Sequence, residues 1–121
     1  MTPRPYRVLV TGGRNHSDRK KVWDALDAVW DSWGWMIVFE GGATGADRLA
    51  KDWADDRGVY CASLPALWNH KPRHIAGPER NAVMVSLEPD EVLAFPDPES
   101  RGTWDCVRKA EAAGLLVTVF E

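Results

Sequence analysis

The sequence predicts an α/β fold in which a five-stranded parallel sheet lies between two layers of helices. Short apolar, β-branched runs alternate strictly with segments in which apolar residues recur every three or four positions. The runs are apolar throughout, as strands buried on both faces require. Right-handed crossovers between parallel strands place helices on both faces of the sheet, which gives a three-layer sandwich. We favour the spatial strand order 3-2-1-4-5.

The expected elements follow one another along the chain. Strands are expected at 7–11, 36–40, 59–64, 91–95 and 115–120. Helices are expected at 18–32, 44–57, about 78–87 and 103–113. Ser17 or Asp18 can cap the first helix, and Gly58 stands where a C-cap glycine belongs. Residues 65–79 carry Pro65, Pro72 and Pro78, so a long loop is expected there, with proline at the start of the third helix.

Length and composition limit the class of protein. The chain has 121 residues, which fits a single domain over 1–121. Its formal net charge of -3 argues against a general nucleic-acid coat protein, which needs a basic surface. No apolar stretch approaches the roughly 20 residues of a membrane span, and no signal-peptide core is visible. We therefore expect a cytoplasmic protein with no membrane partner.

The cysteines and histidines do not form a metal pattern. Cys61 and Cys106 are far apart, so two reduced thiols are expected. His70 and His74 are separated by Pro72, and no cysteine or carboxylate completes a zinc site with them. We expect neither a metal nor a cofactor.

Glycine-rich turns follow the first two strands. Gly12 and Gly13 come after the first, and the segment GGATGAD, residues 41–47, leads from the second strand into a helix. Such a turn lets the backbone approach a ligand, and a helix N-terminus offers N–H groups to an anion. The segment is neither a Walker loop nor a GxGxxG fingerprint. A plain strand–helix turn would also use glycine, but two such turns at the sheet edge where these folds bind ligands favour phosphate binding.

Several polar residues accompany these turns. Arg14 and Arg80 carry guanidinium groups suited to phosphate, although they could instead pair with Asp18 and Glu79. Asp47 either caps its helix, which we slightly favour, or contacts a ribose or base; Asn81 either caps a helix or donates to a ligand. The residues expected to contact a ligand are Gly12, Gly13, Arg14, Gly41, Gly42, Ala43, Thr44, Gly45, Asp47, Arg80, Asn81, Gly102 and Thr103.

Four segments resemble the SLOG superfamily, and its small YspA-like branch of bacteria and phages in particular. They are VLVTGGR at 8–14, GGATGADRLA at 41–50, AGPERNAVM at 76–84, and VLAFP followed by RGTWDCVRKA within 92–110. The superfamily includes the Lonely-Guy nucleotide phosphoribohydrolases and the DprA/Smf DNA-processing proteins. The resemblance implies a Rossmann-like domain that binds a nucleotide or nucleotide-derived ligand, often as a homodimer.

The resemblance also places two catalytic positions of the Lonely-Guy enzymes. Their arginine corresponds to Arg80, in Glu79-Arg80-Asn81 with Met84. Their glutamate corresponds to Cys106, with Asp105 one residue early, and one helical residue turns a side chain by about 100°. Arg80 and Asp105 are thus the candidate catalytic pair, but the departure at Cys106 weakens the case for hydrolysis.

Three functions follow, in order of preference. The first is binding or sensing of a nucleotide-derived ligand, which demands the least of the sequence. The second is cleavage of a nucleotide N-glycosidic bond. The third is binding of single-stranded nucleic acid, which the negative charge and the lack of an interleaved lysine and aromatic stripe disfavour.

Overall fold

The expected architecture is confirmed. The computed structural model describes residues 3–121, in which five parallel strands form one sheet of order β3-β2-β1-β4-β5. The strands are β1 (Tyr6–Gly12), β2 (Met36–Glu40), β3 (Tyr60–Ser63), β4 (Glu91–Phe95) and β5 (Leu116–Val119). The helices are α1 (Arg19–Trp33), α2 (Ala46–Arg57), α3 (Arg73–Ser86) and α4 (Arg101–Ala112). Within this part of the chain, no helix is long and apolar enough to cross a membrane.

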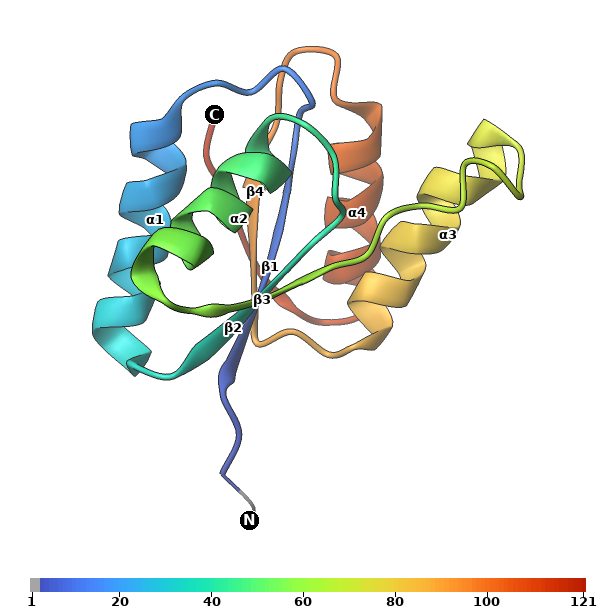
Figure 1. Ribbon diagram of the computed structural model, residues 1–121. Coiled ribbons are helices and arrows are strands. Elements are labelled where there is room, and N and C mark those ends of the chain that lie inside the picture. Colours follow the sequence, from blue (N-terminus) through green and yellow to red (C-terminus); the bar gives the residue numbers. More distant parts are fainter. Residues whose placement is uncertain (1–2) are drawn as a thin grey trace.

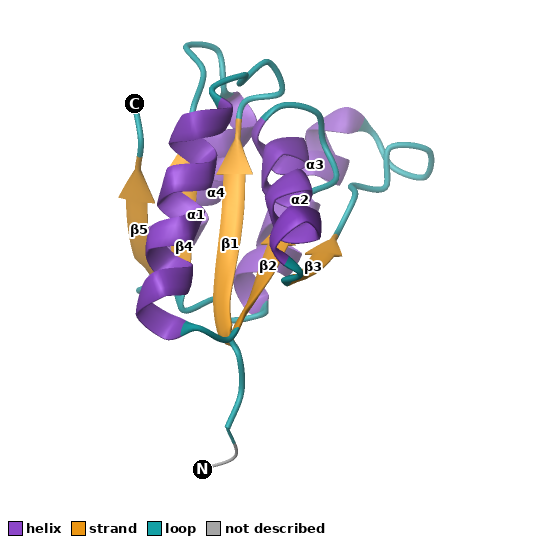
Figure 2. Ribbon diagram, turned by 60° about the vertical axis from the view of Figure 1, so that its left-hand side comes forward, coloured by secondary structure: helices purple, strands orange, loops and turns teal. Residues whose placement is uncertain are grey.

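The helices form two pairs on opposite faces of the sheet. α1 packs beside α2 on one face, and α3 beside α4 on the other (Figures 1 and 2). Successive side chains of β1 pack against the two helix layers alternately, because side chains of a strand alternate between the faces of the sheet. Val8 and Val10 join the core beneath α1 and α2, whereas Leu9 joins Met84 and Cys106 beneath α3 and α4. A continuous apolar strand is therefore what this sheet requires.

The third helix begins earlier than the sequence suggested. The expectation of a loop over 65–79 and a helix from Pro78 is wrong, because α3 starts at Arg73. Pro72 occupies the N-cap, with φ of -59°, and its carbonyl accepts hydrogen bonds from the N–H groups of Ile75 and Ala76. Pro78 lies in the second turn, where it lacks only the N–H that would bond the His74 carbonyl. The proline that starts the helix is therefore Pro72.

The two glycine turns contact each other at the carboxyl edge of the sheet. The Gly13 carbonyl accepts a hydrogen bond of 3.2 Å from the Ala46 N–H, and the Arg14 carbonyl accepts one of 2.9 Å from the Thr44 hydroxyl. Gly45 lies between them with φ of +76°, and a Cβ there would collide with the Gly13 carbonyl oxygen. The junction therefore needs glycine at position 45 for conformation and for space.

We expect Gly45→Ala to lower the free energy of unfolding by at least about 2 kcal/mol, since the left-handed backbone and the collision both oppose a side chain. Gly102→Ala is the matched control, because Gly102 is in α4 and a Cβ there meets nothing within 4 Å. Alanine should change stability there by no more than about 1 kcal/mol, in the stabilising direction. Urea unfolding checks both values. An equal loss in the two variants would contradict this account of the junction.

Candidate functional site

The carboxyl edge brings together the segments that the sequence singled out. Gly12 ends β1, the glycine turn 41–45 follows β2, and Gly102 and Thr103 lie in the first turn of α4 after β4. Arg80 projects from α3 towards the second glycine turn, where it bonds the Gly41 carbonyl. The expected ligand-contact residues therefore gather around this edge, although not all are exposed. Five of them are buried: Gly13, Gly41, Asp47, Asn81 and Thr103.

Two buried carboxylates hold the second glycine turn from beneath. Glu40, 1% exposed at the end of β2, accepts a hydrogen bond from the Gly42 N–H through Oε1 and bonds Ser63 through Oε2. Asp47, 6% exposed in the first turn of α2, accepts bonds from the Gly41 N–H at 3.1 Å and the Ala43 N–H at 3.3 Å through Oδ2. Asp47 therefore does not cap α2, whose N-cap is Gly45 without a side-chain hydrogen bond, and holds the turn that precedes the helix.

This arrangement changes which N–H groups can meet an anion. The N–H groups of Gly41, Gly42 and Ala43 are already bonded to carboxylates. At the start of α2, the Ala46 N–H bonds the Gly13 carbonyl. Among residues 3–121, no protein acceptor bonds the N–H of Asp47 or of Arg48. The N–H groups of Thr44 and Gly45 likewise have no acceptor within residues 3–121, so the donors left here are those of Thr44, Gly45 and the first turn of α2.

Arg80 joins the second glycine turn to the β3–α3 connection. Its Nη1 donates to the carbonyls of Gly41 at 2.7 Å and Leu64 at 3.3 Å, and its Nε donates to the Asn81 side chain. The expected alternative of pairing with Glu79 is not found, since Glu79 pairs with Lys71. In the part of the chain that is described, Arg80 has no carboxylate within ion-pair distance, and Nη2 makes no hydrogen bond. Its charge remains available to an anion.

Burial changes the protonation of Asp47. Removal from water raises the pKa of this carboxyl to about 7, and the nearby negative charge of Glu40 acts in the same direction. The hydrogen bonds from Ala43 and Gly41 and the positive charge of Arg80 oppose the rise. Oδ1 of Asp47 makes no hydrogen bond within residues 3–121 and is not fully enclosed. The edge therefore contains a carboxyl that titrates near neutral pH.

Asn81 and Asp105 connect α3 to α4. The Asn81 amide donates to the Gly102 carbonyl at 3.1 Å and to Asp105 Oδ2 at 3.0 Å. Both Asp105 oxygens also accept from Lys109, at 2.6 and 2.7 Å. Burial opposes ionisation of Asp105, yet the bonds from Lys109 and Asn81 lower its pKa below the usual range. Asp105 is therefore a fixed carboxylate whose hydrogen-bonding capacity is engaged within the protein.

Cys106 lies inside the core. It belongs to α4 and is 0% exposed. Burial raises the pKa of its thiol to about 11, although a hydrogen bond with Thr11 acts against the rise. Cys61 is half-buried, and burial together with Glu40 raises the pKa of its thiol to about 12. Neither thiol is ionised near neutral pH, so neither supplies a nucleophile.

The sequence analysis missed residues that hold the first glycine turn. Asp97 Oδ2 accepts a hydrogen bond of 3.2 Å from the Asn15 N–H, while the Asp97 N–H donates to the Ser100 hydroxyl at 2.6 Å. His16 Nδ1 lies 3.7 Å from Asp97 Oδ1. Neither Asp97 nor Ser100, both in the segment PDPES at 96–100, is among the residues expected from the sequence. Glu40 was missed too, although a carboxylate ending an apolar strand is an unusual choice that could have indicated it.

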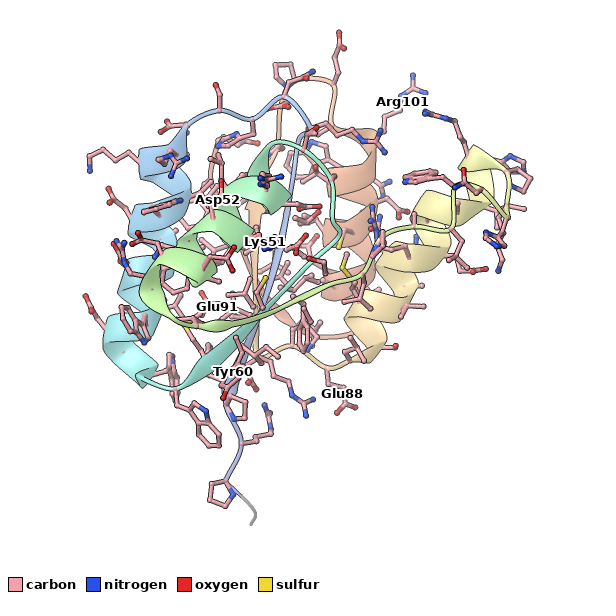
Figure 3. The ribbon with its side chains drawn as sticks, in the orientation of Figure 1. Lys51, Asp52, Tyr60, Glu88, Glu91 and Arg101 are labelled. Carbon is pink, nitrogen blue, oxygen red and sulfur yellow. The ribbon has the colours of Figure 1, made fainter. Side chains whose placement is uncertain are left out.

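Trp68 also borders the edge. It lies in the connection between β3 and α3, and the guanidinium carbon of Arg14 lies 5.1 Å from the centre of its indole ring. Arg14 therefore contacts Trp68 and does not pair with Asp18, which caps α1 through the Lys21 N–H. Arg101 is another exposed cation here, at the upper end of α4 (Figure 3). Cationic side chains thus gather at an edge of a protein whose net charge is negative.

Comparison with known proteins shows relatives of the same size and of larger size. The chain is 41% identical over 120 residues to the Gene 61 protein of Mycobacterium phage D29, covering 94% of this chain and 95% of the relative. Its structure is similar to that of DNA processing protein A (DprA) from Streptococcus pneumoniae, with a TM-score of 0.78 and 18% identity over 95% of this chain. The chain spans about half of that protein, 50% of its length.

A second solved structure has the same kind of fold at lower similarity. The molybdenum cofactor carrier protein from Chlamydomonas reinhardtii gives a TM-score of 0.50 and 15% identity, covering 98% of this chain and 91% of that one. At these identities the two structures support the fold alone. The family model that matches, over residues 6–70, is described as the YspA, cpYpsA-related SLOG family. The chain belongs to the YspA, cpYpsA-related SLOG family.

Proposed function

We propose that the carboxyl edge of the sheet binds an anionic, nucleotide-derived small molecule and releases it unchanged. The observation that carries this proposal is the position of Arg80. It is a partly buried guanidinium without a carboxylate partner in residues 3–121, beside a glycine turn whose following helix has unbonded N–H groups. A partly buried cation of this kind is stabilised by an anion, and phosphate suits both donors. SLOG domains generally bind nucleotide-derived ligands, which agrees with this choice.

The pKa of Asp47 supports the same proposal. A fully ionised carboxylate beside Arg80 would neutralise the guanidinium and repel an incoming phosphate. Because the pKa of Asp47 is about 7, a large fraction of this carboxyl is protonated near neutral pH. The positive charge of Arg80 and the unbonded N–H groups of α2 are then opposed less by Asp47 than they would be by a fully ionised carboxylate.

Glycoside hydrolysis is less well supported. An oxocarbenium-like transition state needs a carboxylate or a water that a free carboxylate activates. Asp105 is engaged by Lys109 and Asn81, and Cys106 is a neutral, buried thiol. Neither of the two candidates at the corresponding positions is placed to do this work.

We expect Arg80→Ala to weaken binding of ADP-ribose or AMP by roughly 1.5–3 kcal/mol, about 10- to 150-fold, since a hydrogen-bonded charge is lost. Calorimetry on folded wild type and variant measures the change. Lys51→Ala is the matched control, because it removes one positive charge from α2 (Figure 3) at a side chain whose ion-pair partner within residues 3–121 is Asp55. Equal affinity in wild type and Arg80→Ala would rule out Arg80 as the anchor.

Asp47 makes stability depend on pH in a definite direction. Its pKa is about 7 in the folded chain and near 3.8 when exposed, so the folded state holds more protons between these values. The free energy of unfolding should therefore fall as pH rises from about 4 through 7. In Asp47→Asn, which keeps an oxygen for the Gly41 and Ala43 N–H groups, this part of the decline should disappear. Urea unfolding of both proteins at pH 5 and pH 8 measures this change. If the free energy of unfolding falls equally between the two pH values in wild type and Asp47→Asn, the buried-carboxyl account is contradicted.

Incubation with AMP should give no multiple turnover, because the structure offers no free carboxylate at the positions where the related hydrolases act. Chromatography detects any released base. Sustained release that Asp105→Asn abolishes would overturn this prediction and establish glycoside hydrolysis in place of simple binding.

A further inference from the structure

We propose that Trp68 forms the base subsite of this ligand site, stacking on a planar purine or pyrimidine whose phosphate is held at the neighbouring glycine turns. The inference rests on the proposed function, since it names the part of the ligand that Trp68 recognises. It makes the ligand class specific: a nucleoside phosphate that retains its base, in preference to a sugar phosphate. The case depends on how the indole is seated, what lies beside it, and how exposed it is.

The connection that carries Trp68 is fixed to the site at its start. The Leu64 N–H donates to the Glu40 carbonyl at 2.8 Å, and the Leu64 carbonyl accepts from Arg80 Nη1. Pro65 lies against the second glycine turn, since a Cβ on Gly42 would meet the Pro65 Cβ at 3.5 Å. A movement of Arg80 or of the glycine turn would therefore change the contacts of the segment that leads to Trp68.

The indole of Trp68 packs against α3 at Gly77. A Cβ at Gly77 would lie 3.3 Å from the indole Cη2 and 3.8 Å from Cζ3, so the absence of a side chain there leaves the room that the ring occupies. The backbone N–H of Trp68 donates to the Ala66 carbonyl at 2.9 Å, which fixes the backbone at this residue. The residue is nevertheless 40% exposed. A large aromatic ring held in place and left partly open to solvent is suited to stacking with an incoming ring.

Two cations that suit a phosphate, the guanidinium groups of Arg14 and Arg73, lie over the ring of Trp68. The guanidinium carbon of Arg14, from the first glycine turn, is 5.1 Å from the ring centre, and that of Arg73, from the start of α3, is 5.7 Å away. Neither arginine forms an ion pair within the described residues, so both charges are available. An aromatic surface and groups that can bind an anion therefore lie side by side. A site that recognises both the base and the phosphate of a nucleotide needs this combination.

Other exposed tryptophans lack these features. Trp35, 50% exposed, lies next to β2 at the opposite end of the sheet, and no arginine within residues 3–121 stacks on it. Trp33 is 57% exposed and stacks on Tyr6 at the same far end. Exposure of an aromatic residue alone therefore does not identify the subsite. Three features together identify Trp68. Its indole packs against Gly77, two guanidinium groups lie over its ring, and its segment begins at Leu64, whose carbonyl bonds Arg80.

The test measures AMP and ribose 5-phosphate binding by calorimetry in wild type, Trp68→Leu, Trp68→Phe and, as the matched control, Trp35→Leu. We expect Trp68→Leu to weaken AMP binding by roughly 5- to 100-fold, the effect of losing one base–aromatic stack, and to change ribose 5-phosphate binding less than about twofold. Trp68→Phe, which keeps an aromatic face, should retain most of the AMP affinity, and Trp35→Leu should change neither ligand.

The outcomes separate this inference from the proposed function. If wild type binds both ligands and Trp68→Leu weakens them equally, or weakens neither, the base subsite is wrong and the phosphate site stands. If wild type binds ribose 5-phosphate as tightly as AMP, the base contributes nothing and the subsite is likewise wrong. If wild type binds neither AMP, ribose 5-phosphate nor ADP-ribose, the proposed function fails and the subsite fails with it. Because Trp68 is partly exposed and Trp68→Phe is conservative, circular dichroism should show folded variants.

Discussion

The arrangement of the edge depends on one constraint: the backbone N–H groups of the second glycine turn are bonded to buried carboxylates. Glu40 and Asp47 take the N–H groups of Gly41, Gly42 and Ala43 from inside the protein. Burying two carboxylates is costly unless hydrogen bonds compensate them, and the turn supplies these bonds. The start of the glycine turn is thus held in one shape by its own acidic supports, and the unbonded donors that follow are the N–H groups of Thr44, Gly45 and the first turn of α2.

The same constraint sets the electrostatics of the edge. Desolvation raises the pKa of Asp47 to about 7, so the carboxyl nearest to Arg80 is only partly charged near neutral pH. Arg80 in turn holds the Gly41 and Leu64 carbonyls and thereby joins the glycine turn to the segment that carries Trp68. Phosphate recognition and base recognition would consequently share one structural connection, and a change at Arg80 would affect both.

Sequence patterns were sufficient for the layers, the strand order and the edge where the glycine turns meet, because these follow from apolar periodicity and crossover handedness. They failed at α3, where Pro78 was taken for the helix start and Pro72 holds that place. Whether Asn81 contacts a ligand stays a prediction; the residue is 4% exposed and its side chain joins α3 to α4. The contacts of Asp97 with the first glycine turn and of Trp68 with Arg14 join segments far apart in sequence, which no local pattern records.

The central claim is that the free donors of the site include the first N–H groups of α2 and the Arg80 side chain, while the N–H groups of Gly41, Gly42 and Ala43 are bonded to buried carboxylates. A titration of ¹⁵N-labelled protein with AMP, followed by amide chemical shifts, tests this most directly. The account predicts the largest shift changes at the N–H groups of Asp47 and Arg48, together with the Arg80 side-chain signals, and smaller ones at Gly41, Gly42 and Ala43. Changes concentrated at the opposite end of the sheet, around Trp35 and Tyr60, would contradict it.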